Sequence, residues 1–496
     1  MIKHCVLYSG GFMKRRIFCF ILFLFVFISL LFVKSFKKEG IDYSVSPVKK
    51  NNNTLSMMLE NDDGVYEYTT SDSWPQKGYS FNAELSKCEN GGELSWDDVS
   101  KKIYMSGNVS DKCYVYFDKM PLGKICEGQN MAICFKENYA FDNALYHHDK
   151  SLENSAEDNS YRYSGGDFII TQKAIDAGFT SLKDTNTSSN DGLIKFYCND
   201  EISIVGNVCS LTQSHYYLLG NNTENKYSTY SEVLTKAIEL GYVKKDNVNN
   251  FVCFGSNDDI CPEDNLYRIV GIFGDNVKLV KYSPATRKLL GEDGGYLGRA
   301  GDLVFFSNAI NSVFGTDEFY YLAYFWNRET GTNKWSESDL NKVNLNKNYV
   351  NNIGSSWSDK IETYKWHTKG NTYENLTTNI NQVYKNEILN DNTALYEAKI
   401  GLLYVSDYYY GVGKSYWQYK HMELLGIDNW LNSGISDFFL TSILNTTKVM
   451  GTYGGNNMNA LVVDNNAYMI RPAFYLKNTI NLLHGLGTID EPYRIS

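Results

Sequence analysis

Cysteine spacing is the clearest chemical signal in the sequence. Residues 39–496 contain eight cysteines, and each lies close to one partner along the chain. The four couples are Cys88 with Cys113, Cys126 with Cys134, Cys198 with Cys209, and Cys253 with Cys261. Disulfides form in oxidising compartments and are rare in the cytosol, so we predict four disulfides and an extracellular location for this part of the chain. Paired cysteines have no free thiolate, which argues against a cysteine nucleophile.

Three polar clusters could do other chemistry. His147, His148 and Asp149 form the most concentrated set, but adjacent residues on a strand point to opposite sides, so we expect a polar surface loop rather than a metal or catalytic site. The segments 183–192 and 256–265 carry many oxygen-bearing side chains of the kind that bind calcium. The first has serine where an EF-hand loop requires glycine, so we expect solvated turns, with calcium as the alternative.

Catalytic motifs give no positive signal. The sequence lacks GxSxG, a glycine-rich phosphate loop and HExxH. We therefore assign no catalytic residue, no metal ligand and no required cofactor, and we favour a protein that is not an enzyme.

Tryptophan is concentrated in the last part of the chain. Aromatic rings can stack on the apolar faces of sugars, and they also supply large buried areas in protein cores. We expect most of these rings to be core residues, while two or three could line an exposed ligand surface. For Arg471, the preferred interpretation is a structural partner of a buried carboxylate, and a role in ligand binding is the alternative. The candidate ligand-binding residues are Trp326, Trp335, Trp417, Trp430 and Arg471.

An uncharged apolar run, IFCFILFLFVFISLLFV, covers residues 17–33. In a helix these residues span about 25 Å, near the lower limit for crossing a bilayer. The run is longer than the apolar region of a typical signal peptide and no small-x-small cleavage site follows it, so a retained anchor is favoured over a cleaved signal peptide. We predict a single-pass protein held in the lipid bilayer by residues 17–33, with its C-terminal bulk outside the cell.

Composition and periodicity predict the fold class. The net charge of −10 argues against a nucleic-acid-binding protein, which would need a basic surface. The content of aromatic residues is 15%, and period-2 runs such as YSFNAEL at 79–85 alternate with Asn, Asp and Gly turns, which is typical of short antiparallel strands. We therefore predict an α+β, strand-dominated, multi-domain ectodomain behind one N-terminal transmembrane helix.

Changes in composition suggest where the domains begin and end. We expect an N-terminal extension over 1–13, a membrane anchor over 14–38, a linker over 39–62, a small β module over 63–120, a Cys-rich region over 121–262, and a C-terminal α+β domain over 263–496. In the Cys-rich region, TQKAIDAGF at 171–179 resembles LTKAIELGY at 234–242. Each predicts a short helix ended by glycine and followed later by an aromatic strand with a cysteine, so we interpret the pair as an internal duplication.

Local patterns in the last domain predict further elements. A hairpin is expected around Gly274, helices are expected over 336–353 and 355–367, and a buried strand is expected in IGLLYV at 400–405. ALVVDNNAYMI at 460–470 is a second hairpin candidate.

Several blocks resemble those of uncharacterised anchored surface proteins of low-GC Gram-positive bacteria. They are CPEDNLYRIVGIF at 261–273, AKIGLLYVSDYYYG at 398–411, RPAFYLK at 471–477 and GLGTIDEPYRI at 485–495. The block at 145–165 is similar to one that usually runs directly into the Cys-Phe-Gly segment, but about 85 residues separate the two here. The resemblance carries no activity. At the level of the fold, the closing domain is similar to C-type-lectin and formylglycine-enzyme-like scaffolds, in which a terminal hairpin closes the structure.

Two function classes follow from these observations. The leading hypothesis is a membrane-anchored extracellular binding or adhesion protein, whose ligand could be a glycan or a surface protein. The alternative is an anchored extracellular hydrolase acting on cell-wall or glycan substrates, which would need paired carboxylates that a sequence cannot pair.

Overall fold

The structure of the protein is a computed structural model, and it describes the chain from residue 54 onward with internal gaps. The described residues are 54–61, 64–69, 77–107, 111–165, 168–183, 191–198, 201–202, 214–220, 223–228, 230–245, 248–297, 323–368, 372–376, 378–389, 394–418, 429–432, 437–442, 447–453, 457–464 and 467–496. Within these ranges, no helix is long and apolar enough to span a membrane. The apolar segment 17–33 lies outside them, so the anchor remains a prediction.

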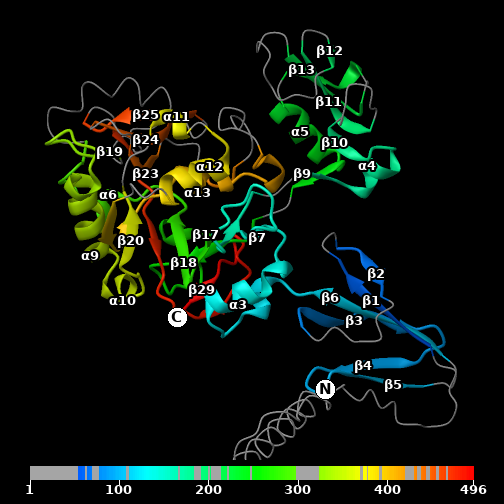
Figure 1. The fold of residues 1–496 in the computed structure, drawn as a ribbon. Coiled ribbons are helices and arrows are strands. Elements are labelled where there is room, and N and C mark those ends of the chain that lie inside the picture. The colour runs from blue at the N-terminus through cyan, green and yellow to red at the C-terminus, as the bar shows by residue number, and fades with distance from the viewer. Residues whose placement is uncertain are drawn as a thin grey trace, which may run out of the picture. The chain divides into compact units, whose positions relative to one another are not determined.

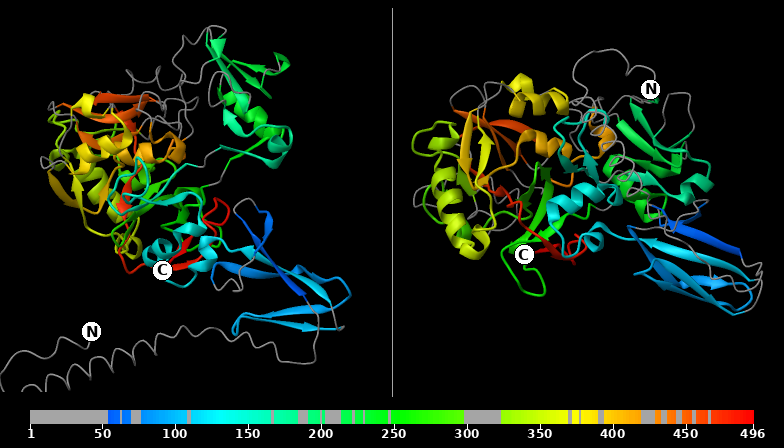
Figure 2. Two further views of the ribbon diagram at one scale, coloured as in Figure 1. Left: turned by 45° about the vertical axis from the view of Figure 1, so that its right-hand side comes forward. Right: turned by 60° about the horizontal axis from the view of Figure 1, so that its bottom comes forward.

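The first of two compact units comprises residues 1–76 and 81–118. Its described part holds a four-stranded sheet in the order β2-β1-β6-β3 and a separate hairpin of β4 and β5. Figures 1 and 2 show the four strands of the sheet side by side, coloured blue. The strands are β1 Thr54–Glu60, β2 Tyr66–Tyr68, β3 Tyr79–Cys88, β4 Glu93–Asp97, β5 Lys102–Ser106 and β6 Lys112–Lys119.

Alternation of apolar and polar residues explains this sheet. β1 runs parallel to β6, and the apolar pairs on one face are Leu55 with Cys113, Met57 with Val115, and Leu59 with Phe117. The rings of Phe81 and Trp96 contact Phe117 on that face, so β4 of the hairpin packs there. β1 lies inside the segment that we expected to be a linker. The sequence did not predict this strand because its apolar residues alternate over only seven positions. Its parallel pairing with β6 also differs from the antiparallel arrangement expected for this region.

The second unit comprises residues 77–80 and 119–496 and contains a seven-stranded sheet. Its path is β22-β27-β18-β17-β8-β7, and β16 also pairs with β17. The strands are β7 Leu145–His147, β8 Tyr161–Tyr163, β16 Phe251–Cys253, β17 Leu266–Phe273, β18 Asn276–Lys281, β22 Ile400–Gly401 and β27 Ala473–Tyr475. The predicted hairpin is confirmed: β17 and β18 pair up to Phe273 and Asn276, and Gly274 has a φ of +60°. Because β16 and β17 pair, the expected boundary at 262 falls inside this sheet.

An insert with its own core separates β8 from β16. Its elements are β9 Phe168–Ile170, α4 Gln172–Asp176, β10 Ser181–Lys183, β11 Gly192–Cys198, β12 Glu201–Ile202, β13 Ser214–Leu218, β14 Lys226–Tyr227, α5 Tyr230–Glu239 and β15 Val243–Lys245. Buried residues from both helices and from β11 and β13 form this core, including Ala174, Leu193, Leu218 and Ala237. β8 and β16 both pair with β17, so the chain leaves and re-enters the seven-stranded sheet at neighbouring positions.

The two similar helices of the insert form as predicted. Gly178 and Gly241 follow them with φ of +97° and +72°, the conformation expected of a helix-ending glycine. The two cysteine-bearing strands are not equivalent, however, because β11 belongs to the sheet of the insert and β16 to the seven-stranded sheet. The two segments are therefore alike in their helices but not in the strands that follow them, and the duplication stays a prediction.

The remaining elements of unit 2 are short. The helices include α2 Leu122–Ile125, α3 Met131–Asn138, α6 Arg287–Leu290, η5 Leu340–Tyr349, α9 Val350–Asn352, α10 Ser355–Ser358, α11 Tyr373–Leu376, α12 Ile380–Tyr384, η6 Lys385–Leu389 and α13 Val405–Tyr410. The small sheets are β19 Ala323–Phe325 with β26 Ala467–Met469, β20 Tyr364–His367 with β21 Leu395–Ala398, β23 Phe438–Ser442 with β24 Lys448–Tyr453 and β25 Asn457–Val462, and the closing hairpin of β28 Leu482–His484 with β29 Arg494–Ile495.

Several local predictions for this region need correction. The helix expected over 355–367 ends at Ser358, because residues 364–367 pair with β21 and place Trp366 opposite Tyr396. The hairpin expected within 460–470 is wrong, since β25 pairs with β24 and β26 pairs with β19. The buried strand expected over 400–405 is limited to β22, and α13 begins at Val405. The described part of the chain is nevertheless strand-dominated α+β, as predicted.

Candidate functional site

Three of the four candidate tryptophans are core residues. Trp326, Trp335 and Trp417 are at most 1% exposed, and the rings of Trp326 and Trp335 lie 4.9 Å apart. Trp430 is half-buried, and its Nε1 donates a hydrogen bond to the Tyr163 carbonyl oxygen at 3.1 Å. The guanidinium of Arg268 lies over the Trp430 ring, with its central carbon 4.5 Å from the ring centroid. These rings therefore do not form a shared exposed surface.

Arg471 has a structural partner. Its Nε donates to Asp437 Oδ2 at 2.8 Å, and its Nη2 donates to the Leu431 carbonyl oxygen at 2.8 Å. Both charged side chains are buried. This matches the preferred interpretation of Arg471 as the partner of a buried carboxylate, and it leaves no basis for assigning a ligand to it.

Three of the four predicted disulfides are present. They join Cys88 to Cys113, Cys126 to Cys134, and Cys253 to Cys261. The fourth predicted bridge, from Cys198 to Cys209, lies outside the described residues because Cys209 is not among them. Each observed bridge joins neighbours along the chain, so each stabilises a local loop.

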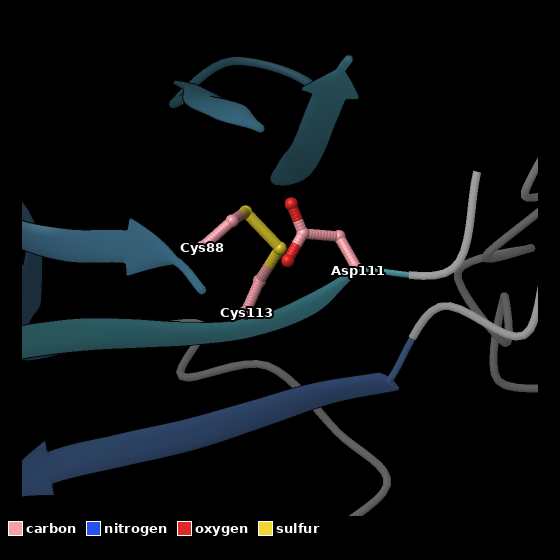
Figure 3. A group of neighbouring side chains, drawn as sticks. All are labelled: Cys88, Asp111 and Cys113. Carbon is pink, nitrogen blue, oxygen red and sulfur yellow. A yellow bond between two sulfur atoms is a disulfide. The ribbon is translucent and has the colours of Figure 1, made fainter. Parts of the chain in front are cut away.

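The first bridge lies beside a buried carboxylate (Figure 3). Sulfur atoms of Cys88 and Cys113 and an oxygen of Asp111 lie within 4.8 Å of one another, the spacing of a possible metal site. Both sulfurs are already bonded to each other, which leaves no thiolate to ligate a metal. Burial opposes ionisation of Asp111, but backbone N–H groups of Asn90, Gly92 and Lys112 outweigh it and hold the pKa of this carboxyl below its usual value. Asp111 therefore orders the turns around the bridge.

The two adjacent histidines face different surroundings, as predicted for a strand. The His147 ring stacks on Tyr161 at 4.4 Å, and its Nδ1 lies 3.1 Å from an Asp149 oxygen. His148 is fully buried, which differs from the polar surface loop expected there. Its Nδ1 accepts a hydrogen bond from the Ala156 N–H at 3.1 Å, and burial lowers its pKa well below the usual value. No chelating pair results.

The solvent-facing side of the unit 1 sheet carries a row of tyrosines. Strand register places Met58 opposite Tyr68 on one neighbour and opposite Tyr116 on the other, so these side chains share a face. Tyr66 and Tyr114 lie two residues from Tyr68 and Tyr116 and therefore project from the same side. We call this set the tyrosine face: Met58, Tyr66, Tyr68, Tyr114 and Tyr116. Tyr68 is 61% exposed and the other four are partly exposed.

Polar contacts fix the tyrosine face in place. The Tyr66 hydroxyl donates a hydrogen bond to Asp118 Oδ1, and Asn82 Nδ2 donates to the same oxygen at 2.9 Å. The hydrogen bond to Asp118, together with burial and the charge of Asp118, raises the pKa of Tyr66 to about 12. Tyr66 and Tyr116 meet edge to face at 5.1 Å, and Lys112 Nζ lies 5.0 Å from the Tyr114 ring. The result is a row of rings with hydrogen-bonding groups beside it.

Sequence reasoning missed this face although its signal is present. In KCYVYFDK at 112–119, Cys113, Val115 and Phe117 are buried while Tyr114 and Tyr116 alternate with them. That alternation predicts a half-buried strand whose outer face is aromatic. Tyrosines of this kind are ordinary in strands, so only their alignment with β2 distinguishes them.

A second cluster, of opposite character, lies inside unit 2. We call it the buried ionic cluster: Asp158, Arg162, Lys278 and Asp407. Arg162 Nη2 lies 2.7 Å from Asp158 Oδ2, and its Nη1 lies 3.3 Å from Asp407 Oδ1. Lys278 Nζ contacts Asp407 Oδ2. The exposed fractions of the side chains of Lys278, Asp407 and Arg162 are only 0%, 2% and 3%.

Three members of the cluster come from different elements, and Asp158 lies in the loop before β8. Arg162 lies on β8 and Lys278 on β18, while Asp407 lies in the first turn of α13. The Asp407 carboxylate also accepts the Tyr404 N–H at 2.9 Å, so it caps that helix. A further buried carboxyl, Glu387, accepts the N–H groups of Val405 and Ser406 at 3.0 and 2.9 Å. Burial raises the pKa of Glu387.

Aromatic rings enclose the two cations of the cluster. Lys278 Nζ lies 4.6 Å from the Tyr404 centroid and 5.4 Å from the centroids of Trp366 and Tyr475. The Arg162 guanidinium lies 4.5 Å from the Phe273 ring. Burial lowers the pKa of Lys278, although the charge of Asp407 opposes that shift. The cluster therefore has groups that could react with one another but little access to solvent.

Comparison with known proteins adds no further information: no protein-family model, curated protein or solved structure matches this chain.

Proposed function

We propose that this protein is a membrane-anchored extracellular binding protein whose tyrosine face holds a neutral polysaccharide. The observation that carries the proposal is the strand register that gathers four phenol rings on one face of a small sheet. Its opposite face is occupied by the core of unit 1, so the tyrosine face is not needed to pack that core. The three disulfides support an oxidising compartment, and the predicted anchor at 17–33 accounts for surface retention.

The chemistry of the tyrosine face suits sugars. Sugar rings present C–H groups on one face, which pack on aromatic rings, and hydroxyl groups at the rim, which need hydrogen-bond partners. Asp118 and Asn82 stand beside Tyr66 and can supply such partners. A small or compact ligand would need a concave pocket, whereas an extended polymer can bind along an open sheet.

Charge favours a neutral polymer. Glu60 lies opposite Tyr66, Asp118 lies at the end of β6, and Glu89 accepts the hydrogen bond of the Tyr114 hydroxyl. Lys112, the cation above Tyr114, is already within 3.4 Å of Glu89. An anionic polymer would therefore meet more carboxylates than free cations.

The test is retention of the purified full chain on two immobilised neutral polysaccharides, cellulose and chitin. We expect at least one of these to retain the wild-type protein, and we expect the double variant Tyr68→Ala/Tyr116→Ala to elute without retention. Tyr104→Ala is the matched control, because Tyr104 is 54% exposed in the same unit but lies on the β5 hairpin. Retention of no polysaccharide, or equal loss in the Tyr104→Ala control, would contradict the proposal.

A further inference from the structure

The contact between Lys278 and Asp407 is unusual among the lysine pairs of the described residues. By comparison, Lys281 lies 3.7 Å from Asp264, whose side chain is 59% exposed. Lys278 and Asp407 are both buried, lie 129 residues apart in the chain, and meet inside a ring of aromatic side chains. An amine and a carboxyl held together away from water can condense to an amide, because the water that would reverse the reaction is excluded.

We propose that Lys278 and Asp407 form an intramolecular isopeptide bond, which covalently links strand β18 to helix α13. The bond joins Lys278 Nζ to Asp407 Cγ. This inference is independent of the polysaccharide-binding proposal, since the two regions belong to different units of the chain.

The reaction balances without an external reagent. The Lys278 ammonium first transfers a proton to Asp407 Oδ2, which gives a neutral amine and a carboxylic acid. The amine lone pair then attacks Cγ, and Oδ2 leaves as water after taking a second proton from the nitrogen. The products are one amide and one water molecule, with no change in oxidation state.

The surroundings support each step. Burial favours the neutral amine and lowers the pKa of Lys278. Arg162 Nη1 lies 3.3 Å from Oδ1, the oxygen that carries negative charge in the tetrahedral intermediate and remains in the amide. The charge of Arg162 is balanced by Asp158 at 2.7 Å, so Asp407 is not required as its counter-ion.

Geometry separates this pair from other buried ion pairs. Arg471 and Asp437 are also buried and in contact, but a guanidinium stays protonated and is not a nucleophile. Lys281 is buried too, but its nearest carboxylate is the more distant and exposed Asp264. Lys281 therefore supplies a matched control on the same strand.

The experiment is mass spectrometry of the purified full chain after reduction and denaturation. The isopeptide bond lowers the mass of the protein by one water relative to the sequence. In a tryptic digest, the peptide that contains Lys278 should be uncut after this residue and joined to the peptide that contains Asp407. The Lys281→Arg variant should keep both signatures.

Two variants make the result specific. Asp407→Asn can form the same amide by losing ammonia, so its mass should equal that of the wild-type protein. Lys278→Arg should have the full mass of its sequence and remain soluble enough for this measurement, which needs no native fold. Wild-type protein of full mass, with normal cleavage after Lys278 in a sample that shows a cooperative thermal transition, would overturn the proposal.

Discussion

The tyrosine face and the buried ionic cluster contain the same residue types, but the first is exposed to solvent and the second is buried. Both place tyrosines around a carboxylate, with Tyr66 beside Asp118 in one and Tyr404 beside Asp407 in the other. On the unit 1 sheet, strict alternation leaves one side of the strands in solvent. In unit 2, β18 is buried along almost its whole length, so Lys278 and Lys281 are buried with it. An aromatic and charged composition therefore indicates a binding surface only where strand register exposes it.

The largest expected effect comes from removing the Asp407 side chain from the buried ionic cluster. Asp407→Ala leaves Lys278 without its carboxylate partner and removes the cap of α13. An uncompensated buried charge typically costs about 3–5 kcal/mol, and this variant also lacks the amide link proposed above. Denaturant unfolding followed by tryptophan fluorescence measures this loss, since Trp366 lies beside Lys278.

The double variant Lys278→Met/Asp407→Leu sharpens that result. It leaves no unpaired charge at this position, and replacing buried ion pairs by apolar residues is often neutral. We expect it to be more stable than Asp407→Ala, although the covalent link is lost in both. Equal instability of the two variants would show that packing, rather than the unpaired charge, dominates.

Disulfide removal should have the next largest effect and should differ between the two units. The Cys88–Cys113 bridge has a sequence separation of 25, and the Cys253–Cys261 bridge has a separation of 8. Chain-entropy arguments give about 3.5 kcal/mol for the longer loop and about 2.5 kcal/mol for the shorter one. Paired Cys→Ser variants, compared by calorimetry, test this order. A larger loss from the shorter loop would point to local packing around Cys253 instead.

Acid sensitivity should report the buried histidine. Burial, helped by the charge of Arg162, lowers the pKa of His148, so the folded protein favours the neutral ring. Unfolded histidine binds a proton near pH 6.5, so the stability from neutral His148 is present above that pH and is lost as the pH falls below it. The slope is at most about 1.4 kcal/mol per pH unit. His148→Gln should flatten the loss between pH 6.5 and 5, as measured by thermal unfolding across that range.

Periodicity predicted the local features better than the sites. The alternation at 79–85, the hairpin at Gly274 and three cysteine couples all depend on neighbours along the chain, and all are present. β1 escaped detection because its short apolar alternation is surrounded by polar residues. The helix expected through Trp366 does not form there, because residues 364–367 pair with β21, which is distant in the sequence.

The sites depend on contacts between residues far apart in the chain, and the spacing of residues in one sequence does not predict such contacts. Arg162 and Asp407 are 245 residues apart, so nothing local links them. Tryptophan content pointed to Trp326, Trp335 and Trp417 as ligand-binding residues. All three are buried, because burying a large apolar ring stabilises a core more than burying a small side chain does. The tyrosine face required the pairing of β2 with β1 and of β1 with β6, and each pairing joins separate segments.

The smallest expected change in stability is at the tyrosine face. Tyr68→Ala removes a ring that is 61% exposed, so the free energy of unfolding should change by no more than about 0.5 kcal/mol. One stacking contact is worth about 0.5–1.5 kcal/mol, so affinity for the retained polysaccharide should fall by up to about tenfold. Affinity electrophoresis and denaturant unfolding measure the two quantities on the same samples. If Tyr68→Ala cost as much stability as Asp407→Ala, the tyrosine face would be a packing surface, and the contrast between the two regions would disappear.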